Sequence, residues 1–460
     1  MTITDQLSSF AAGLELRDLP PAVRERAKYL MLDCIGNMIC ARHDSESTPA
    51  LIAAVRAMGM AQGNAHVFGD TEGYSPAGAT LINGALAHSL DFDDTHAAAI
   101  LHPGAPIIPA VLAAAEMMVD GSGGEVIAAI AAGYEVALRL ALALPAGAHY
   151  DRGFHPTATC GGFGAAAGAA RMFRLSPAQL ASAFGIVLSQ TAGSLQFLAN
   201  GAWTKRFQVG WAGMSGLAAA CLAREGFKGA AQPIEGKHGF LNAYSPSPEP
   251  DRVLRELGQS WELMQTGVKP YPSCRWGHAG IDAALALRAE QKLAPEAIES
   301  VTLGLSRAGM LLIGEPAEKK ARPENIVDGQ FSAPFVLATA LSTGAMDWSS
   351  YDRLTDPAIQ ALMRRIRCEN DPEIEAEFPA NMSGKLTVRA GGREFVKTVI
   401  VPKGEPGTFL SAAELTAKFK GLTQRPLGEA QAASLAQAVL GLDQLNSAAA
   451  LFPLGTPKQA

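Results

Sequence analysis

The chain has 460 residues, of which 48% are hydrophobic and 18% are charged, and its formal net charge is −6. A chain of this length and composition can bury a large core and is expected to form two domains, and its charge gives no reason to expect nucleic acid or a membrane as a partner. The start, "MTITDQLSSF", lacks the basic and then apolar pattern of a secretory signal, and the six cysteines form no C-x-x-C pair. We therefore expect a cytoplasmic protein with reduced thiols.

Residues from about 5 to 265 follow a helical pattern. The segment "PAVRERAKYLMLDCIGNMICA" opens with proline in its first turn, and "SPAQLASAFGIVL" opens with Ser176 as a helix cap. The most apolar stretch, "GGEVIAAIAAGYEVALRLALAL", is interrupted by Glu125, Glu135 and Arg139, which favours a buried helix over a membrane span. Small residues are abundant, so the helices of this region are expected to pack closely.

The pattern changes near residue 266. The segment "IESVTLGLS" alternates like a strand, and "GKLTVRAGGREFVKTVIVP" predicts two strands joined at Gly391 and Gly392. The segments "GQFSAPFVLATALSTG" and "DPAIQALMRRI" favour helices, and the C-terminal segments return to helix. We predict a mainly α protein with a large all-helical domain, residues 1–266 together with 403–460, and a smaller α+β domain, residues 267–402. A cleft between two such domains is a common place for a site.

The stretch "HSLDFDDTHAAAILHPGAP" sets several titratable groups between apolar segments. If it continues a helix, His88, Asp91 and Thr95 share one face. The alternative is an exposed helix end with capping aspartates, which fits Asp93 as well as a functional role does. For Asp91 and His102 the apolar surroundings favour a function. A metal site is a competing interpretation, but neither H-E-x-x-H nor a calcium-binding loop occurs here.

A second polar cluster is "HYDRGFHPTATCGGFGAAAGAARM", which holds Tyr150, His155, Thr157 and Thr159. We read it as a glycine-rich turn that enters an alanine-rich helix, whose first N–H groups can bind an anion. The pattern is not that of a nucleotide-binding loop. The alternatives are a loop histidine bonded to nearby backbone, a tyrosine at a helix end, and threonines that cap the helix.

Two further clusters carry cations in apolar segments. The segment "ANGAWTKRFQVGWAG" holds Lys205 and Arg206, and "GVKPYPSCRWGHAGIDAAL" holds Lys269, Tyr271, Cys274 and Arg275. A lysine in a dry cleft can act as a base, although it can also be a surface charge on an apolar stem. The four clusters together supply groups for proton transfer and groups that hold carboxylates. That combination suits the removal of a proton next to a carboxylate.

The chain resembles the MmgE/PrpD family along nearly its whole length. The similar segments are "HSLDFDDTH", "HPGAPIIPAVLA", "HYDRGFHPTATCGGFGAAAGAARM", "KPYPSCRWGHAGIDA", "QFSAPFVLATAL" and "KGEPGTFLSAAELTAKF". The family includes 2-methylcitrate dehydratase, cis-aconitate decarboxylase and iminodisuccinate epimerase. The resemblance implies a helical domain with a smaller α+β lid domain, a homodimer, and activity without a metal or an organic cofactor.

The resemblance also implies roles for individual residues. The functional residues of the decarboxylases correspond to Asp91, Thr95, His102, His155, Lys205 and Lys269, and the acid/base pair of the epimerase corresponds to Tyr150 and Lys269. Decarboxylases have histidine where this chain has Cys274 and tyrosine where it has Phe335. Dehydratases usually carry a "DHTTL"-like sequence where this chain has "FHPTATC". The form "HYDRGFHPT" is similar to the epimerase.

We therefore predict a cofactor-independent lyase or isomerase that acts on a small di- or tricarboxylate by dehydration or epimerisation, with cis-aconitate-type decarboxylation as the alternative. The predicted catalytic residues are Lys269, Tyr150, His102, His155 and Asp91. The residues expected to contact the substrate are Thr95, Thr157, Lys205, Arg275, Tyr271 and Cys274. A metal-dependent hydratase and a non-catalytic helical dimer that binds a ligand are the competing interpretations. The second of these gives no reason for so many polar groups in apolar segments.

Overall fold

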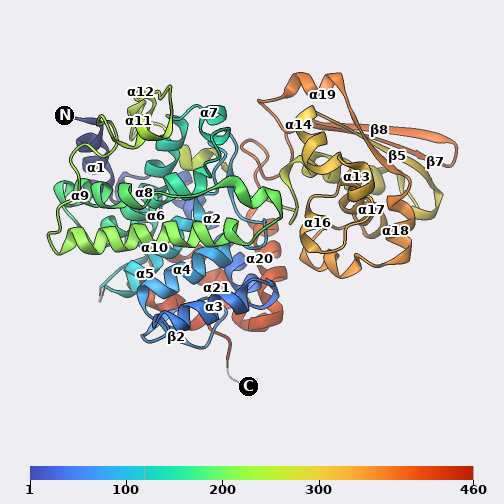
Figure 1. Ribbon diagram of the computed structural model, residues 1–460. Helices are drawn as coiled ribbons and strands as arrows, with labels where there is room; N and C mark the ends of the chain where they lie inside the picture. Colours follow the sequence, from blue (N-terminus) through green and yellow to red (C-terminus); the bar gives the residue numbers. More distant parts are fainter. Residues whose placement is uncertain (119, 459–460) are drawn as a thin grey trace. The chain divides into compact units, whose positions relative to one another are not determined.

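The computed structural model describes residues 1–118 and 120–458. The chain forms two compact units, one of Met1–Gly267 with Ser411–Ala460 and one of Val268–Leu410 (Figure 1). The second unit continues past residue 402, where the prediction ended it. Its last segment stays with it because the Gly404 carbonyl accepts the Val268 N–H at 2.9 Å, and Lys403 N–H donates to Asp282 at 2.7 Å.

The first unit is built mainly from α-helices. These are α1 (Ile3–Gly13), α2 (Pro21–Asp44), α3 (Thr48–Ala57), α4 (Pro76–Ala87), α5 (Gly104–Glu116), α6 (Gly123–Leu142), α7 (Ala146–Tyr150), α8 (Pro156–Met172), α9 (Pro177–Val187), α10 (Thr204–Arg224), α11 (Phe240–Tyr244), α12 (Asp251–Leu254), α20 (Ala412–Leu427) and α21 (Glu429–Leu440). Every residue of α8 is buried, and α5, α6 and α10 pack around it. As predicted, Ser176 caps α9 by accepting the Gln179 N–H.

Glycines allow the central helices to approach closely. A Cβ atom on Gly133 of α6 would lie 2.8 Å from the Gly164 carbonyl oxygen, and one on Gly164 of α8 would lie 2.7 Å from that of Gly133. A Cβ on Gly161 would lie 2.6 Å from the Pro106 ring. The prediction of a glycine-rich turn before this helix is therefore wrong. The glycines lie inside α8, where backbone packing requires them.

The C-terminal helices return to the first unit, so that the red α20 lies beside the blue α2 in Figure 1. The first unit also contains two short antiparallel strand pairs, which the prediction of an all-helical domain omitted. They join β1 (Ala65–His66) to β2 (Gly73–Tyr74) and β3 (Thr95–His96) to β4 (Thr266–Gly267). The second pair ties the loop after α4 to the end of the first unit's long N-terminal segment.

The second unit is an α+β unit, as predicted. Its sheet has the order β6-β5-β7-β8, with β5 (Ile298–Leu305) parallel to β6 (Ile366–Asn370) and antiparallel to β7 (Gly384–Ala390), which pairs with β8 (Arg393–Val399). Gly391 and Gly392 have φ of 57° and 71°, which suits the predicted two-residue hairpin turn. The helices are α13 (His278–Gln291), α14 (Arg307–Gly309), α15 (Ala317–Lys320), α16 (Ile326–Gln330), α17 (Ala333–Thr343), α18 (Pro357–Met363) and α19 (Pro372–Glu377). The predicted fold class, mainly α with a smaller α+β part, is confirmed.

Within the described residues no helix combines the length and the apolar character that crossing a membrane requires. The apolar segment at residues 123–142 forms α6, a buried helix as predicted. The six cysteines are all free thiols.

Candidate functional site

The site is built on the loop that follows α4. The helix ends at Ala87, so the predicted helical face with His88, Asp91 and Thr95 is wrong. Asp91 has a φ of 52°, a left-handed conformation that no α-helix includes and that non-glycine residues adopt at a cost. Lys418 of α20 donates to the Phe92 carbonyl at 2.7 Å, so this backbone oxygen bonds to a side chain instead of to a helical N–H.

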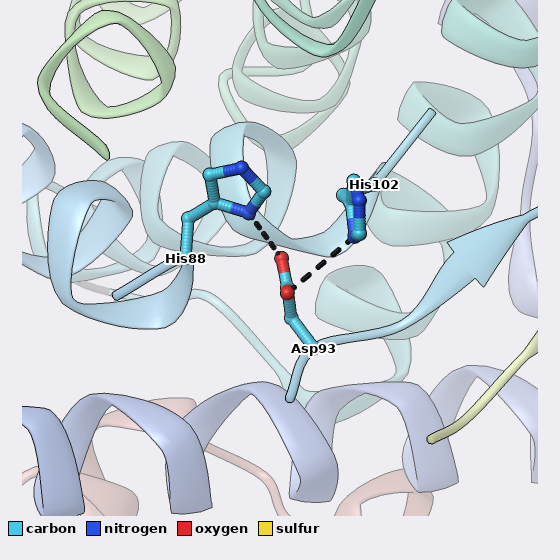
Figure 2. A group of neighbouring side chains, drawn as sticks. All are labelled: His88, Asp93 and His102. Carbon is cyan, nitrogen blue, oxygen red and sulfur yellow. Dashed lines mark hydrogen bonds and ion pairs between the residues drawn. The ribbon is translucent and has the colours of Figure 1, made fainter. Parts of the chain in front are cut away.

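Asp93 lies between two histidines at the centre of this loop (Figure 2). Its Oδ2 is 2.6 Å from His88 Nδ1, and its Oδ1 is 3.4 Å from His102 Nδ1. The His88 and Asp93 side chains are fully buried, whereas 15% of the His102 side chain is exposed. The His88 and His102 rings meet edge to face with centroids 4.7 Å apart. The partly exposed His102 ring therefore lies against the buried carboxylate of Asp93.

The contacts of His102 determine which nitrogen carries its proton. Nδ1 lies 2.9 Å from the Asp94 carbonyl oxygen, which can only accept, so the neutral ring carries its proton on Nδ1. The His102 N–H donates to Thr157 Oγ1 at 3.2 Å. Hydrogen bonds thus hold both the backbone and the ring of His102. Its Nε2 carries the lone pair that can take a proton.

His155 has the opposite tautomer. Gln208 Oε1 accepts the Ser194 N–H at 3.0 Å, which orients the amide so that its NH2 group donates to His155 Nδ1 at 2.7 Å. The proton of the neutral ring is therefore on Nε2, which can donate. Burial, reinforced by the positive charge of Lys205, holds the pKa of His155 well below its usual range. The His88 ring lies 5.8 Å from that of His155 and 4.7 Å from that of His102, so the cluster contains one acceptor imidazole, His102, and one donor imidazole, His155.

A cation lies at the same site. Lys205, the second residue of α10, donates to Asp91 Oδ1 at 2.9 Å, and its side chain is 24% exposed. Burial alone would lower the pKa of Lys205, but the Asp91 carboxylate outweighs it and raises this pKa. Lys205 is therefore a permanent cation at neutral pH. It is suited to hold a carboxylate rather than to act as a base.

Asp94 supports the turn that carries His102. Its carboxyl accepts the Tyr134 hydroxyl at 2.7 Å and the Gly104 N–H at 3.1 Å. Burial, together with the nearby Asp93 carboxylate, raises the pKa of Asp94 to about 8, so it keeps its proton at neutral pH. A Cβ on Gly104 would lie 2.8 Å from both Asp94 Oδ1 and the Tyr134 hydroxyl. This close approach explains the glycine of the "HPGAP" segment.

A buried ion pair anchors the loop from the opposite side. Lys418 Nζ lies 2.5 Å from Asp33 Oδ1, and it stands 3.6 Å above the centre of the Phe92 ring. Burial raises the pKa of Asp33 to about 6, although Lys418 opposes this rise. Helices α2 and α20 thus hold Phe92, the residue between Asp91 and Asp93.

Three further predicted residues lie in the first unit. Thr95 Oγ1 is 3.4 Å from His102 Nδ1, so Thr95 belongs to the histidine cluster. Thr157 is fully buried and accepts the His102 N–H, which gives it a structural contact with the site. Tyr150 is half-buried and ends α7. The contacts predicted for these three residues with a substrate stay predictions.

The other predicted residues lie in the second unit and are buried there. Lys269 is 3% exposed. The Tyr271 hydroxyl donates to Asp282 at 2.6 Å, and Arg275 forms an ion pair with Glu405. Cys274 donates its N–H to the Gln330 carbonyl, and Phe335 is a core residue stacked on Tyr351. Tyr271 and Arg275 thus have partners inside their own unit, and their predicted contacts with a substrate stay predictions.

His88, Asp93 and His102 are also residue types that bind metals, and their ligand atoms lie within 4.8 Å of one another. Two ligands held at about 2.0–2.2 Å in a tetrahedral shell lie roughly 3.3 Å apart. The 2.6 Å between His88 Nδ1 and Asp93 Oδ2 is instead a hydrogen-bond distance, and His102 Nδ1 donates to a carbonyl. The geometry fits shared protons better than a shared metal ion.

A surface cleft of about 780 Å³ lies elsewhere in the first unit, and it contains none of the predicted site residues. Two of its arginines already have partners, since Arg171 donates to the Leu14 carbonyl and Arg174 pairs with Glu125 at 2.8 Å. These contacts join the ends of helices. We therefore place the candidate chemistry at the histidine cluster.

The sequence alone did not identify several residues that shape this site. They are His88 and Asp93 as a bonded pair, Gln208, Tyr134, Asp94 and Lys418. Tyr134 did give a signal, as a hydroxyl within an apolar helix that needs a buried partner. Gln208 and Lys418 gave none, because each meets its partner only through tertiary packing.

Comparisons with known proteins agree with this architecture. Residues 5–253 match the MmgE/PrpD N-terminal domain, and residues 271–444 match the MmgE/PrpD C-terminal domain. The chain therefore belongs to the MmgE/PrpD family, as the sequence motifs predicted.

Several curated relatives are similar along almost their whole length. The chain is 27% identical to the cis-aconitate decarboxylase-like protein oryM of Aspergillus oryzae, covering 96% of this chain and 94% of the relative. It is 27% identical to the cis-aconitate decarboxylase of Aspergillus terreus, covering 98% and 95%. It is 26% identical to that of Homo sapiens, covering 98% and 94%. The second and third of these relatives are named as decarboxylases, which are lyases.

Proposed function

We propose that the protein is a lyase that removes carbon dioxide from a small tricarboxylate of the cis-aconitate type. The observation that carries the proposal is the pairing of a donor imidazole, His155, and an acceptor imidazole, His102, beside the cation Lys205. The names of the curated relatives support decarboxylation ahead of the dehydration or epimerisation that we predicted first.

The proposed reaction needs a proton and a site for negative charge. As a carboxylate leaves as carbon dioxide, the electrons of the broken C–C bond form a new double bond, and the electrons of the old double bond take up one proton. We assign the supply of that proton to His155 Nε2–H, and the binding of a remaining carboxylate, against the negative charge of the whole chain, to Lys205. This donation leaves His155 without its Nε2 proton, and His102 Nε2, after taking a proton from the solvent, can return one to His155 for the next turnover. None of these steps requires an organic cofactor.

Dehydration or epimerisation is the second candidate. It is favoured by the lone pair on His102 Nε2, because both reactions begin with removal of a proton next to a carboxylate. It is also favoured by Cys274 and Phe335, which replace a histidine and a tyrosine of the decarboxylases. In this reading Lys269 and Tyr150 form the acid/base pair, and Asp91 orients Lys205.

A single experiment separates these reactions. Chelator-treated protein is incubated in heavy water with cis-aconitate, 2-methylcitrate, citrate or iminodisuccinate and followed by proton NMR. Loss of carbon dioxide from cis-aconitate with one deuterium incorporated supports the first proposal. Deuterium next to a carboxylate with loss of water, or with inversion, supports the second. Turnover only after a divalent metal is restored supports a hydratase, and no reaction with any acid favours a binding protein.

We also propose a homodimer, as the family resemblance implied. Helix α10 and the residue that precedes it, Trp203, carry large apolar side chains at helical spacing. Trp203, Phe207, Trp211 and Leu222 are each between 37% and 43% exposed. Such a row is typical of a surface that a second copy covers. Trp211→Glu is expected to yield monomers in size-exclusion chromatography with light scattering. Phe227→Glu, at a more exposed residue beyond α10, is the control and is expected to leave the wild-type mass.

A further inference from the structure

Figure 2 shows the Asp93 carboxylate with one oxygen toward each of two imidazole rings. We propose that Asp93 is a positioning residue, which stabilises the positive charge of His102 after its Nε2 has taken a proton, and that His88 holds Asp93 for this task. The inference rests on the proposed function, because a charge on His102 has a role only if His102 exchanges protons with a substrate.

Asp93 is an ionised carboxylate held by a neutral histidine. Burial lowers the pKa of His88 to about 4, so at neutral pH this ring is uncharged and donates its Nδ1–H to Asp93 Oδ2. Burial alone would raise the pKa of Asp93, but its interactions with His88 and His102 bring this pKa well below its usual range. A buried negative charge therefore lies beside His102 before any substrate arrives.

Two acceptors, the Asp94 carbonyl oxygen and Asp93 Oδ1, lie near His102 Nδ1 and have different roles. The Asp94 carbonyl, at 2.9 Å, takes the hydrogen bond that sets the tautomer. Asp93 Oδ1, at 3.4 Å, is buried and makes no hydrogen bond within the described residues. Leaving a buried acceptor without a hydrogen bond lowers stability, so it calls for a reason. A charge that appears on His102 during turnover supplies one, because the carboxylate is already in place to stabilise it.

Asp93 is the ionised carboxylate that remains beside the His102 ring once the neighbouring groups are considered. The titratable groups that face it are His88, His102, His155, Asp33, Cys34, Asp94 and Lys205. Asp94 keeps its proton at neutral pH, and Asp33 is paired with Lys418. Lys205 is paired with Asp91. Among the residues that the structure describes, the side-chain partners of Asp93 are the two histidines.

The first test compares Asp93→Asn with Asp70→Asn. Asp70 is a buried carboxylate of the same unit, paired with Arg42 at 2.7 Å, so its variant measures the cost of losing a buried charge alone. For Asp93→Asn we expect kcat to fall about 100-fold to 1,000-fold with little change in KM, by analogy with carboxylates that support catalytic histidines. The acid limb of the pH profile is expected to move to lower pH, because protonated His102 loses its counter-charge. Asp93→Glu is expected to restore part of kcat.

The second test needs no substrate. In protein labelled with ¹⁵N-histidine, the short bond between His88 Nδ1–H and Asp93 is expected to give a strongly downfield proton signal. That signal should be absent from Asp93→Asn and present in Asp70→Asn. The ¹⁵N shifts of His102 should report a proton on Nδ1. If no carboxylic acid is turned over but these signals appear, the proposed function fails while the buried pair stands.

Three results would overturn the inference. The first is wild-type kcat and an unchanged pH profile in Asp93→Asn. The second is a loss of activity equal to that of Asp70→Asn, with parallel losses of thermal stability, which makes Asp93 merely structural. The third is a stoichiometric divalent metal bound by the wild type and lost from Asp93→Asn, detected by elemental analysis after dialysis against zinc.

Discussion

Two segments of the chain looked alike in the sequence and differ in the structure. The loop between α4 and α5 and the segment at residues 268–282 both set polar groups among apolar residues. In the loop, the polar contacts of the His102 ring with the described residues involve Nδ1 and not Nε2, and Lys205, although paired with Asp91, has a side chain that is 24% exposed. In the second segment, Tyr271 is bonded to Asp282 and Arg275 to Glu405.

The difference shows that the density of buried polar groups does not by itself distinguish a reactive site from a structural tie. Both arrangements satisfy the rule that buried polar groups need partners. The two arrangements differ in whether all hydrogen-bonding atoms of a side chain are bonded within the protein or one of them can still bind a substrate.

The largest effect is expected at His102. His102→Gln keeps a side chain of similar reach but has no basic lone pair, so turnover is expected to fall about 1,000-fold or more. The measurement is kcat/KM with the acid that gives turnover in heavy water. His66→Gln, at a surface histidine paired with Glu116, is the control and should retain activity. Near-normal turnover in His102→Gln would show that His102 and its loop take no part in the reaction.

The second prediction concerns Arg275. If the ion pair with Glu405 is a structural tie, Arg275→Gln leaves a largely buried carboxylate without its partner and lowers the free energy of unfolding by about 3–5 kcal/mol. The double variant Arg275→Met with Glu405→Leu should recover most of that loss. Chemical denaturation followed by circular dichroism measures both. An unchanged stability with lost substrate affinity would instead return Arg275 to the binding role that the sequence predicted.

The third prediction concerns Lys205, the cation that we expect to hold a carboxylate. Lys205→Met is expected to raise KM about 100-fold, because the substrate loses a charged partner in a partly dry site. Lys228→Met removes an exposed lysine from the same unit and should leave KM unchanged. A fall in kcat with unchanged KM would show that Lys205 transfers a proton rather than binding the substrate.

The sequence predicted the fold more completely than it predicted the site. Helix starts such as Ser176 and the hairpin at Gly391 are local, so their signals lie in neighbouring residues. The motifs also led to His102, Lys205 and Asp91. They did not reveal the path of the loop, because the path depends on long-range bonds such as that from Lys418 to the Phe92 carbonyl, 326 residues apart. Tautomers are equally non-local, since a distant Gln208 sets that of His155.

The smallest effect is a pH dependence of stability that comes from Asp94. In the folded protein its carboxyl keeps a proton up to about pH 8, whereas in the unfolded chain it ionises near the ordinary value of 3.8. Between these values the folded state binds the extra proton, so wild-type stability falls as pH rises, by at most about 1.4 kcal/mol per pH unit. Asp94→Asn has no such proton, so its free energy of unfolding relative to wild type should rise between pH 5 and pH 7.5.

Urea denaturation at several pH values measures this difference, in which the groups common to both proteins cancel. Asp70→Asn again serves as the control. Burial opposes it, but the Arg42 ion pair and the other hydrogen bonds to Asp70 lower its pKa, so its pH effect is confined to more acidic solutions and its difference should be flat in this window. A flat difference for Asp94→Asn as well would mean that Asp94 is ionised in the folded protein. His102 would then lie beside two negative charges rather than one, and the role that we assign to Asp93 would have to be shared between the two aspartates.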